Sequence, residues 1–306
     1  MTARRLVRYW NRFFFAPCPP TAIALYRIFF GVLLLADMAL LWPDLLVWYG
    51  EKGAVTLDTA RSTAIGTRLN LFALLPPGDF WVWLFFAVFV LFACFLTIGL
   101  FTRLSTVIVF VGLVSIHHRN LFILNSGDSL LRLTSFLLMF APCGAALSVD
   151  RWKRIRRGQE GPEPPLHSPW AQRLIQIQIA IAYFSTFYWK TQGSMWIDGT
   201  ALYYVSHIAE FKRFPVPFLF DNLWLIKAAT WFTLLTEFSL AVLVWIKELR
   251  YYVLAAGVLL HLGIEWSMNI PLFEWIFIAT YITFVEPAHL DRSWQWLRRR
   301  LHRRRR

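Results

Sequence analysis

The chain has 306 residues, of which 58% are apolar and only 16% are charged, whereas soluble domains carry about 25% charged residues. A soluble protein of this length could not bury so much apolar surface, so the composition excludes that class and indicates an integral membrane protein. The net charge of +13 does not indicate nucleic-acid binding, because the basic residues flank apolar segments, where they mark the cytoplasmic side and attract anionic lipid.

Eight apolar segments approach the length of about 20 residues that a membrane-spanning helix requires. We therefore predict an all-α fold, a polytopic transmembrane helix bundle of eight spans, with seven or nine spans as alternatives. The first segment lacks the cleavage site of a signal peptide, so it is interpreted as a true span. In chain order, the predicted spans are residues 21–44, 80–101, 104–120, 128–147, 172–191, 222–246, 250–268 and 271–286.

Basic residues predict the orientation, because Lys and Arg concentrate in cytoplasmic segments. With eight spans every basic cluster falls on one side, so we expect both termini in the cytoplasm and a multi-pass protein of the plasma membrane. The clusters are Arg4, Arg5, Arg8 and Arg12; Arg103; Arg151, Lys153, Arg154, Arg156 and Arg157; Lys247 and Arg250; and the tail RRRLHRRRR.

No soluble module interrupts the spans, so we predict a single membrane domain over residues 1–306. Its basic cytoplasmic tails cover about residues 1–18 and 291–306. A flexible cytoplasmic linker rich in Pro and Gly covers about residues 150–171.

Two outward segments, residues 45–79 and 192–221, are rich in Trp, Tyr and Pro, which indicates short helices at the level of the lipid headgroups. No internal repeat relates the two halves of the chain, and the inner halves of the spans hold little polar character beyond Asp37 and Glu237. Ion or proton transport is therefore the least favoured function.

Lys190 ends the fifth span, in the stretch IAYFSTFYWKTQGSMWIDG. A buried lysine can lose its proton and act as a base, which makes Lys190 a candidate catalytic residue. The alternative is a flanking lysine whose ammonium group reaches the water. Trp196, in the same stretch, is a candidate substrate-binding residue.

His261 lies well inside the seventh span, with Glu265 and Asn269 one and two helical turns further on, roughly on the same face. Ionisable groups at this depth usually face the bundle interior and have a partner. We predict Glu265 as the partner that orients a catalytic His261, and Glu265 and Asn269 as substrate-binding residues. A structural pair between helices is the alternative.

The third span closes with the sequence HHRN. Adjacent His117 and His118 diverge on a helix, so only one can face a shared site, and His118 is the candidate catalytic residue. Arg119 and Asn120 are candidate substrate-binding residues. Arg119 either anchors to lipid phosphate or holds an acidic partner.

The fourth span opens with NSGD, in which Asn125 is a candidate for substrate binding and Asp128 for proton transfer. Capping of the helix by Asp128 is the alternative. Together with Lys190 and His261, these groups all fall on the outer halves of four spans. We therefore expect them to meet in one cavity that opens outward.

Two other functional interpretations, a soluble esterase and a metal site, are not favoured. The string GDSL marks a soluble esterase class, but that class needs an α/β sheet. His118, His261 and Glu265 are a minor candidate set for a metal, but the chain has no H-E-x-x-H spacing or other dense ligand pattern, so we predict no metal site.

Five segments in the same order resemble the HTTM domain family, whose best-known members are the vitamin K-dependent gamma-carboxylases. The likeness covers roughly residues 20–290. Its segments are ALYRIFFGVLLLADM, GLFTRLS, HHRNLFILNSGDSLLRLTSFLLMFAPCGAALSVDRW, AYFSTFYWKTQGSMWIDGTAL and LLHLGIEWSMNIPLFEWIF. Each segment alone is weak evidence, whereas their order and spacing together are fairly specific.

The resemblance implies that Lys190 matches the lysine that deprotonates vitamin K hydroquinone, and that His261 matches a later histidine of the family. The family's histidine at the start of span four is absent, so Asp128 or His118 would take its place. The large lumenal domain of the carboxylases is absent as well, so carboxylation of protein glutamates is not expected.

We therefore expect an HTTM-class membrane protein, with both an enzymatic and a non-enzymatic reading open. The first is a carboxylase-related enzyme with a lysine base acting on a quinol-like or lipid-borne substrate, with reduced vitamin K as the quinol that the resemblance suggests. The second is a non-catalytic module that binds or matures a secreted peptide, because bacterial relatives also resemble the membrane component of the sporulation-delaying toxin system. Either would reside in a bacterial inner membrane.

Overall fold

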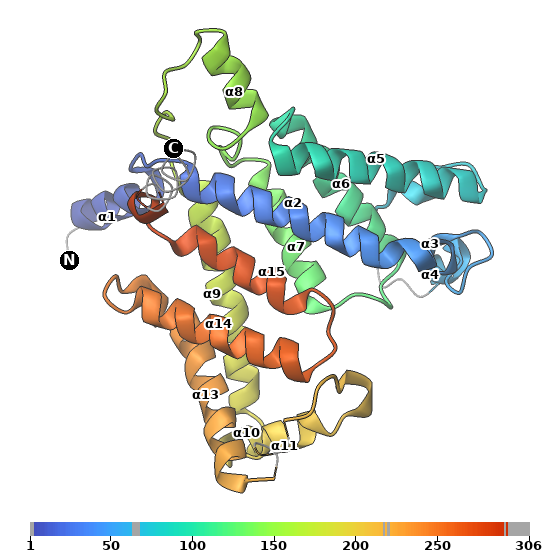
Figure 1. Cartoon of the computed structure of the whole chain (residues 1–306), viewed down its shortest axis with the longest axis vertical. Coiled ribbons are helices and arrows are strands. Elements are labelled where there is room, and N and C mark those ends of the chain that lie inside the picture. The colour runs from blue at the N-terminus through green and yellow to red at the C-terminus, as the bar shows by residue number, and fades with distance from the viewer. Residues whose placement is uncertain (1–2, 63–67, 217, 219–220, 291, 293–306) are drawn as a thin grey trace, which may run out of the picture. The chain divides into compact units, whose positions relative to one another are not determined.

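The computed structural model describes residues 3–62, 68–216, 218, 221–290 and 292 (Figure 1). Within these residues every regular element is a helix, and the β pairings are isolated bridges. The predicted all-α fold is therefore confirmed. The predicted basic tail at residues 291–306 lies outside the described residues, apart from Arg292.

Each predicted span contains a helix. The corresponding helices are α2 (Thr21–Leu41), α5 (Asp79–Ile98), α6 (Thr102–Arg119), α7 (Ser126–Leu138), α9 (Trp170–Thr191), α13 (Leu223–Ala241), α14 (Arg250–Ser267) and α15 (Phe273–Thr280). Among the described residues, two helical stretches are long and apolar enough to cross a membrane, Thr21–Tyr49 and Asp79–Ile98. The count of eight spans stays a prediction.

The predicted end of the fourth span is wrong. Helix α7 ends at Leu138, and residues 139–148 form turns that contain Pro142 and Gly144. Thirteen residues at about 1.5 Å each rise only about 20 Å, less than the hydrocarbon thickness of about 30 Å. The apolar composition of this segment extends further than its helix because proline and glycine end helical hydrogen bonding.

The predicted linker is also more ordered than its composition indicates. It begins with helix α8 (Val149–Arg156), and the loop that follows is attached at several points. Arg151 donates to the carbonyl of Pro162 at 2.8 Å, and the backbones of Cys18 and His167 exchange two hydrogen bonds of 2.9 and 3.0 Å. Side-chain bonds from α8 and backbone pairing with the N-terminal segment therefore fix the conformation of this loop, which its Pro and Gly content alone would predict to be flexible.

The chain divides into two compact units. Unit 1 comprises residues 1–173 and 285–306, and unit 2 comprises residues 174–284. In unit 1, α2 packs against α5, α5 against α6, and α6 against α7 (Figure 1). Close approach is possible where Gly112 of α6 lies against the Phe89 ring of α5, since a Cβ atom there would lie 2.3 Å from that ring.

Two charged side chains satisfy backbone groups at one end of unit 1. Arg27 of α2 is fully buried and donates to the carbonyls of Cys143 and Leu147 at 3.0 and 2.6 Å. Asp150 accepts from the backbone of Phe101 and from both the backbone and the hydroxyl of Thr102, at 2.7 to 3.0 Å. These bonds cap the first turn of α6 and the chain after α7, whose backbone groups would otherwise lack partners.

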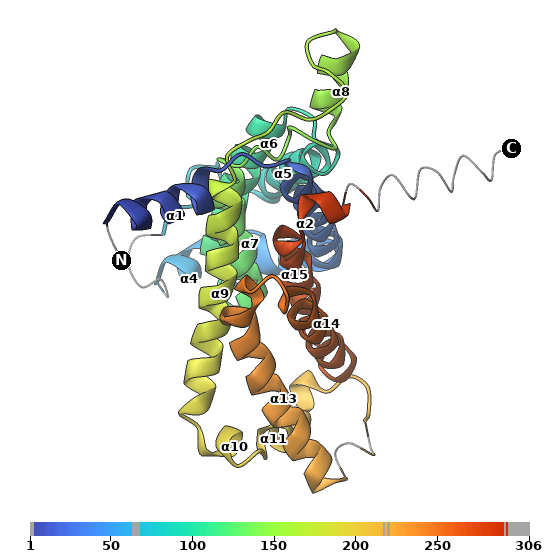
Figure 2. The same cartoon turned by 90° about the vertical axis from the view of Figure 1, so that its left-hand side faces the viewer.

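Unit 2 is built from α9, α13, α14 and α15, with α13 packed on α14 and α14 on α15. The short helices α10 (Ser194–Ile197) and α11 (Ala201–Ser206) pack on α13 (Figure 2). The predicted outward segments thus contain short helices, here α10 and α11, and in unit 1 α3 (Leu45–Tyr49) and α4 (Leu57–Ser62). Their position at the headgroup level stays a prediction.

Candidate functional site

Unit 2 holds an ion pair between Lys190 of α9 and Glu237 of α13. The Lys190 side chain is 25% exposed and that of Glu237 is 8% exposed. The lysine Nζ also lies 4.7 Å from the centroid of the Trp196 ring, so a carboxylate and an aromatic face share the ammonium group. Lys190 thus has a partner on a neighbouring helix, and its catalytic role stays a prediction.

A second buried pair joins His261 of α14 to Glu274 of α15. The His261 Nδ1 atom bonds Glu274, and both side chains are almost fully buried. The prediction that Glu265 orients His261 is wrong: the Glu265 carboxylate pairs with Arg213 at 2.5 Å. One helical turn separates Glu265 from His261 on the same helix, whereas the α14–α15 hairpin brings Glu274 opposite the imidazole.

Tyr183 of α9 extends this pair into a network. Its hydroxyl lies 2.6 Å from His261 Nε2 and 2.6 Å from the hydroxyl of Tyr281. If His261 is neutral and donates from Nδ1 to Glu274, its Nε2 accepts from Tyr183, whose oxygen then accepts from Tyr281. Tyr281 approaches because Gly257 of α14 has no Cβ atom, which would lie 2.7 Å from the Tyr281 oxygen.

The two pairs are part of one polar region in unit 2. Tyr183 lies on the same face of α9 as Lys190, two turns earlier, and Lys190 also interacts electrostatically with Glu274. Each carboxylate keeps one buried oxygen without a hydrogen-bond partner among the described residues, Oε2 of Glu237 and Oε1 of Glu274. Buried acceptors of this kind are normally bonded, so the region contains two acceptors that the described residues leave unsatisfied.

Four residues of this network were not among the predicted site residues: Tyr183, Glu237, Glu274 and Tyr281. Glu237 and Glu274 carry a signal in the sequence, because an acid inside an apolar segment usually faces a partner in the bundle interior. The two tyrosines carry none, because aromatic residues fill apolar helices in any case.

The remaining predicted residue of unit 2, Asn269, is exposed and pairs through its backbone with Phe211. Glu265 and Arg213 likewise join the segment before α13 to the end of α14. For both Glu265 and Asn269 the structure therefore provides a structural role, and substrate binding by them stays a prediction.

In unit 1, the NSGD motif forms a helix cap. Asn125 accepts from the backbone of Gly127 and Asp128 at 2.7 and 3.3 Å, and Asp128 accepts from the backbone of Asn125 at 2.7 Å. This reciprocal capping box confirms the capping alternative for Asp128. Proton transfer by Asp128 stays a prediction.

In the HHRN motif at the end of α6, three side chains are buried and one, that of His118, is partly exposed. His118 bonds the carbonyl of Leu69 at 2.9 Å and is partly exposed, whereas His117 is buried and its Nδ1 has no partner in the described part of the chain. Asn120 is buried and bonds Trp48 and Phe122 through its side chain. Arg119 is buried as well, at 3% exposure, and lines a pocket.

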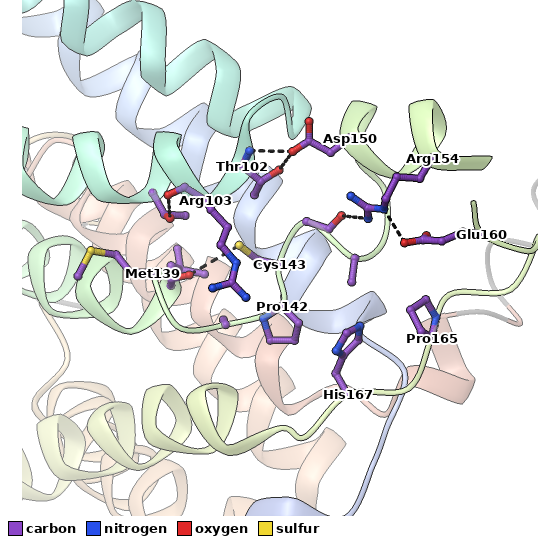
Figure 3. A pocket seen from close by; sticks show the side chains of 15 residues that line it. Thr102, Arg103, Met139, Pro142, Cys143, Asp150, Arg154, Glu160, Pro165 and His167 are labelled. Carbon is purple, nitrogen blue, oxygen red and sulfur yellow. Dashed lines mark hydrogen bonds and ion pairs between the residues drawn. The ribbon is translucent and has the colours of Figure 1, made fainter. Parts of the chain in front are cut away.

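A separate pocket of about 210 Å³ lies at the opposite end of α6. Arg103 and His167 point into it from different sides (Figure 3). Its acidic groups are already engaged, since Asp150 caps α6 and Glu160 pairs with Arg154 at 2.5 Å. These bonds join α8 to the start of α6 and hold the loop after α8 against α8.

The predicted site residues thus form two polar groups, one within each unit. Lys190, Trp196 and His261 belong to unit 2, and His118, Arg119, Asn120, Asn125 and Asp128 to unit 1. One cavity shared by the four spans stays a prediction. Among the described residues, no three His, Cys, Asp or Glu side chains are grouped as metal ligands would be.

The all-helical architecture and the apolar composition of its helices are consistent with a membrane protein. The HTTM domain family model matches residues 15–289, most of the chain and parts of both units. The chain therefore belongs to the HTTM domain family. No solved structure matches it significantly.

Proposed function

We propose that this protein is a multi-pass enzyme of a bacterial inner membrane in which Lys190 takes a proton from a hydroxyl group of a quinol-like or lipid-borne substrate. The observation that carries the proposal is the Lys190–Glu237 pair, with its unpartnered carboxylate oxygen beside the His261 network. A quinol presents hydroxyl donors that suit such acceptors. The family resemblance suggests reduced vitamin K as the quinol.

Lys190 must first lose its own proton, since an ammonium group cannot act as a base. Glu237 is the acceptor in contact with it. In the proposed step, the ammonium group passes its proton to the Glu237 carboxylate, which leaves a neutral amine beside a neutral carboxylic acid. The amine then takes the substrate hydroxyl proton, which leaves a substrate oxyanion paired with the Lys190 ammonium and a neutral Glu237.

His261 and the residues bonded to it provide a second route for protons. The series Tyr281, Tyr183, His261 and Glu274 is continuous through hydrogen bonds, and an imidazole can accept a proton on one nitrogen while releasing one from the other. We assign this series to proton movement after the first step. Asp128 and His118 keep a proposed role in the same reaction, whereas carboxylation of protein glutamates is not part of the proposal.

The topology proposed here has eight spans and cytoplasmic termini. Helix α1 (Ala3–Phe15) supports the inner-leaflet position of the N-terminus, because it is amphipathic and basic. Leu6, Val7 and Trp10 form one exposed apolar face, and the opposite face carries Arg4, Arg5, Arg8 and Arg12. Helices of this pattern lie in the interface of anionic membranes.

The test compares Lys190→Arg with wild type in purified full-length protein. Arginine keeps the positive charge and can pair with Glu237, but it is always protonated and cannot be a base. Quinones retained by the protein are measured by mass spectrometry, and the conversion of added reduced vitamin K is followed by chromatography. We expect Lys190→Arg to fold and to lose turnover, whereas the exposed Lys247→Arg keeps it. Turnover in Lys190→Arg equal to wild type would disprove the base role.

The non-catalytic alternative has one observation in its favour, the exposed aromatic side chains of the outward segment of unit 2. They include Tyr203, Tyr204, Phe211, Phe214 and the nearby Trp224, which is 76% exposed. A surface of this kind could hold a secreted peptide. This alternative predicts that Tyr204→Ser and Trp224→Ser reduce the cellular phenotype more than Lys190→Arg, and that a peptide copurifies with the protein.

A further inference from the structure

In unit 1, at the end of α6, a buried guanidinium group keeps one nitrogen without a hydrogen-bond partner among the described residues. A half-open pocket of about 360 Å³ is lined there by residues of α3, α4, the 3₁₀ turn Leu71–Ala73 and the start of α5, where the chain continues beyond α2 (Figure 1). This volume falls within the range of about 300–1,000 Å³ typical of small-molecule sites.

Arg119 supplies the charge. One of its terminal nitrogens, Nη2, donates to the carbonyl of Val55 at 2.7 Å, which fixes the guanidinium group. The other, Nη1, is buried and has no hydrogen-bond partner in the part of the chain that the structure describes. Leaving a buried charged donor unpaired is costly, so Nη1 is a donor that an acceptor on a bound molecule would satisfy.

The deep walls of the pocket are aromatic and apolar. Tyr49 and Phe72 are both buried, with their ring centroids 5.7 Å apart. The Tyr49 hydroxyl is directed to the carbonyl of Ile116, at 3.4 Å. At the rim, exposed Asp58 and Arg61 pair with each other at 3.7 Å, and exposed Glu51 adds a carboxylate there. Among the described lining residues, the buried guanidinium of Arg119 is therefore the cation without a carboxylate partner.

We propose that this pocket binds a small monoanionic carboxylate with an aromatic or apolar body. One carboxylate oxygen accepts from Arg119 Nη1, and the body lies against Tyr49 and Phe72. A single guanidinium neutralises one negative charge. A phosphate group carries up to two, and the second would be uncompensated near Asp37 and Asp128, which both interact electrostatically with Tyr49.

Equilibrium dialysis of radiolabelled benzoate against purified full-length protein in detergent tests the proposal, with protein-free micelles as the blank. We expect saturable binding of one benzoate per chain. Phenyl phosphate should compete at least about tenfold less well, a difference of about 1.4 kcal/mol. Benzyl alcohol, which keeps the ring and lacks the charge, should not compete at tenfold excess over benzoate.

Two variants locate the binding. Arg119→Gln should weaken it at least about tenfold, which corresponds to about 1.4 kcal/mol. Arg119→Gln also removes the bond to Val55, so it could disturb the fold around the pocket. Ala73→Trp provides a second test that leaves this bond intact. Ala73 is exposed and lines the pocket, and a tryptophan there would fill the pocket mouth with its indole. Its neighbour Leu74 is 80% exposed and does not line the pocket, so Leu74→Trp is the matched control.

Loss of benzoate binding in Ala73→Trp but not in Leu74→Trp supports the proposal. Absence of saturable binding, equal binding in both tryptophan variants, or equal competition by benzyl alcohol or phenyl phosphate would overturn it. The proposal does not depend on the lysine base, so Lys190→Arg should bind benzoate like wild type. The two proposals can therefore fail separately.

Discussion

The hydroxyl of Tyr183 lies 2.6 Å from Nε2 of His261, and the opposite nitrogen of that imidazole bonds Glu274. Tyr183 comes from α9, and the other two come from α14 and α15. Both ring nitrogens of a buried histidine are therefore engaged. Because the two partners differ in chemistry, the arrangement favours one tautomer of His261, with its Nδ1 proton on the side of the carboxylate.

Tyr183→Phe keeps the ring and removes the hydroxyl that joins His261 to Tyr281. We expect a loss of about 1–3 kcal/mol in the free energy of unfolding, because two buried polar atoms lose a partner. Tyr188→Phe, on the same helix but exposed, is the control and should change stability little. Denaturant titrations of both variants measure the difference, and equal stabilities would show that the Tyr183 hydroxyl contributes nothing.

Glu274→Ala and Glu265→Ala distinguish the partner found in the structure from the partner predicted from sequence. Removing Glu274 leaves a buried imidazole nitrogen unpaired, so we expect a loss of about 1–3 kcal/mol or more. The Glu265–Arg213 pair is partly exposed, and such pairs contribute about 0–1 kcal/mol. Thermal unfolding in the same detergent should rank Glu274→Ala as the less stable variant, and the reverse order would contradict the observed pairing.

The Lys190–Glu237 pair should show energetic coupling. We expect Lys190→Met to destabilise the protein by leaving the Glu237 carboxylate buried without its counter-charge. Glu237→Gln added to Lys190→Met should recover part of that loss, with a coupling energy of about 0.5–3 kcal/mol. The two single variants and the double variant, unfolded in denaturant, give this value, and strictly additive losses would mean that the two groups do not interact.

Asp150→Ala removes the carboxylate that caps α6. The expected loss is about 0.5–2 kcal/mol, the usual cost of deleting a helix cap. Glu163→Ala is the control, because Glu163 is an exposed acid in the loop after α8. Far-ultraviolet circular dichroism during thermal unfolding measures both, and no difference between them would remove the capping role from Asp150.

The helices could be predicted from the sequence because a long apolar segment indicates a helix that crosses or packs within the membrane. Composition indicated an all-α chain, and each predicted span contains a helix. Errors occurred where a local feature stopped a helix inside an apolar stretch, as at Pro142 and Gly144 after α7. Capping by Asp128 could be anticipated as well, because its partner Asn125 lies only three residues earlier in the chain.

Lys190 and His261 stood out in the sequence because ionisable groups are rare and costly in apolar helices. Their partners, however, depend on which helices pack together and on the relative position of the two helices along their axes. Glu265 is four residues from His261 and was the natural choice, whereas Glu274 is thirteen residues away, on the next helix. The sequence determined the class of protein, its helices and its unusual charges; tertiary packing decided which acid meets which base, because that depends on the register between helices.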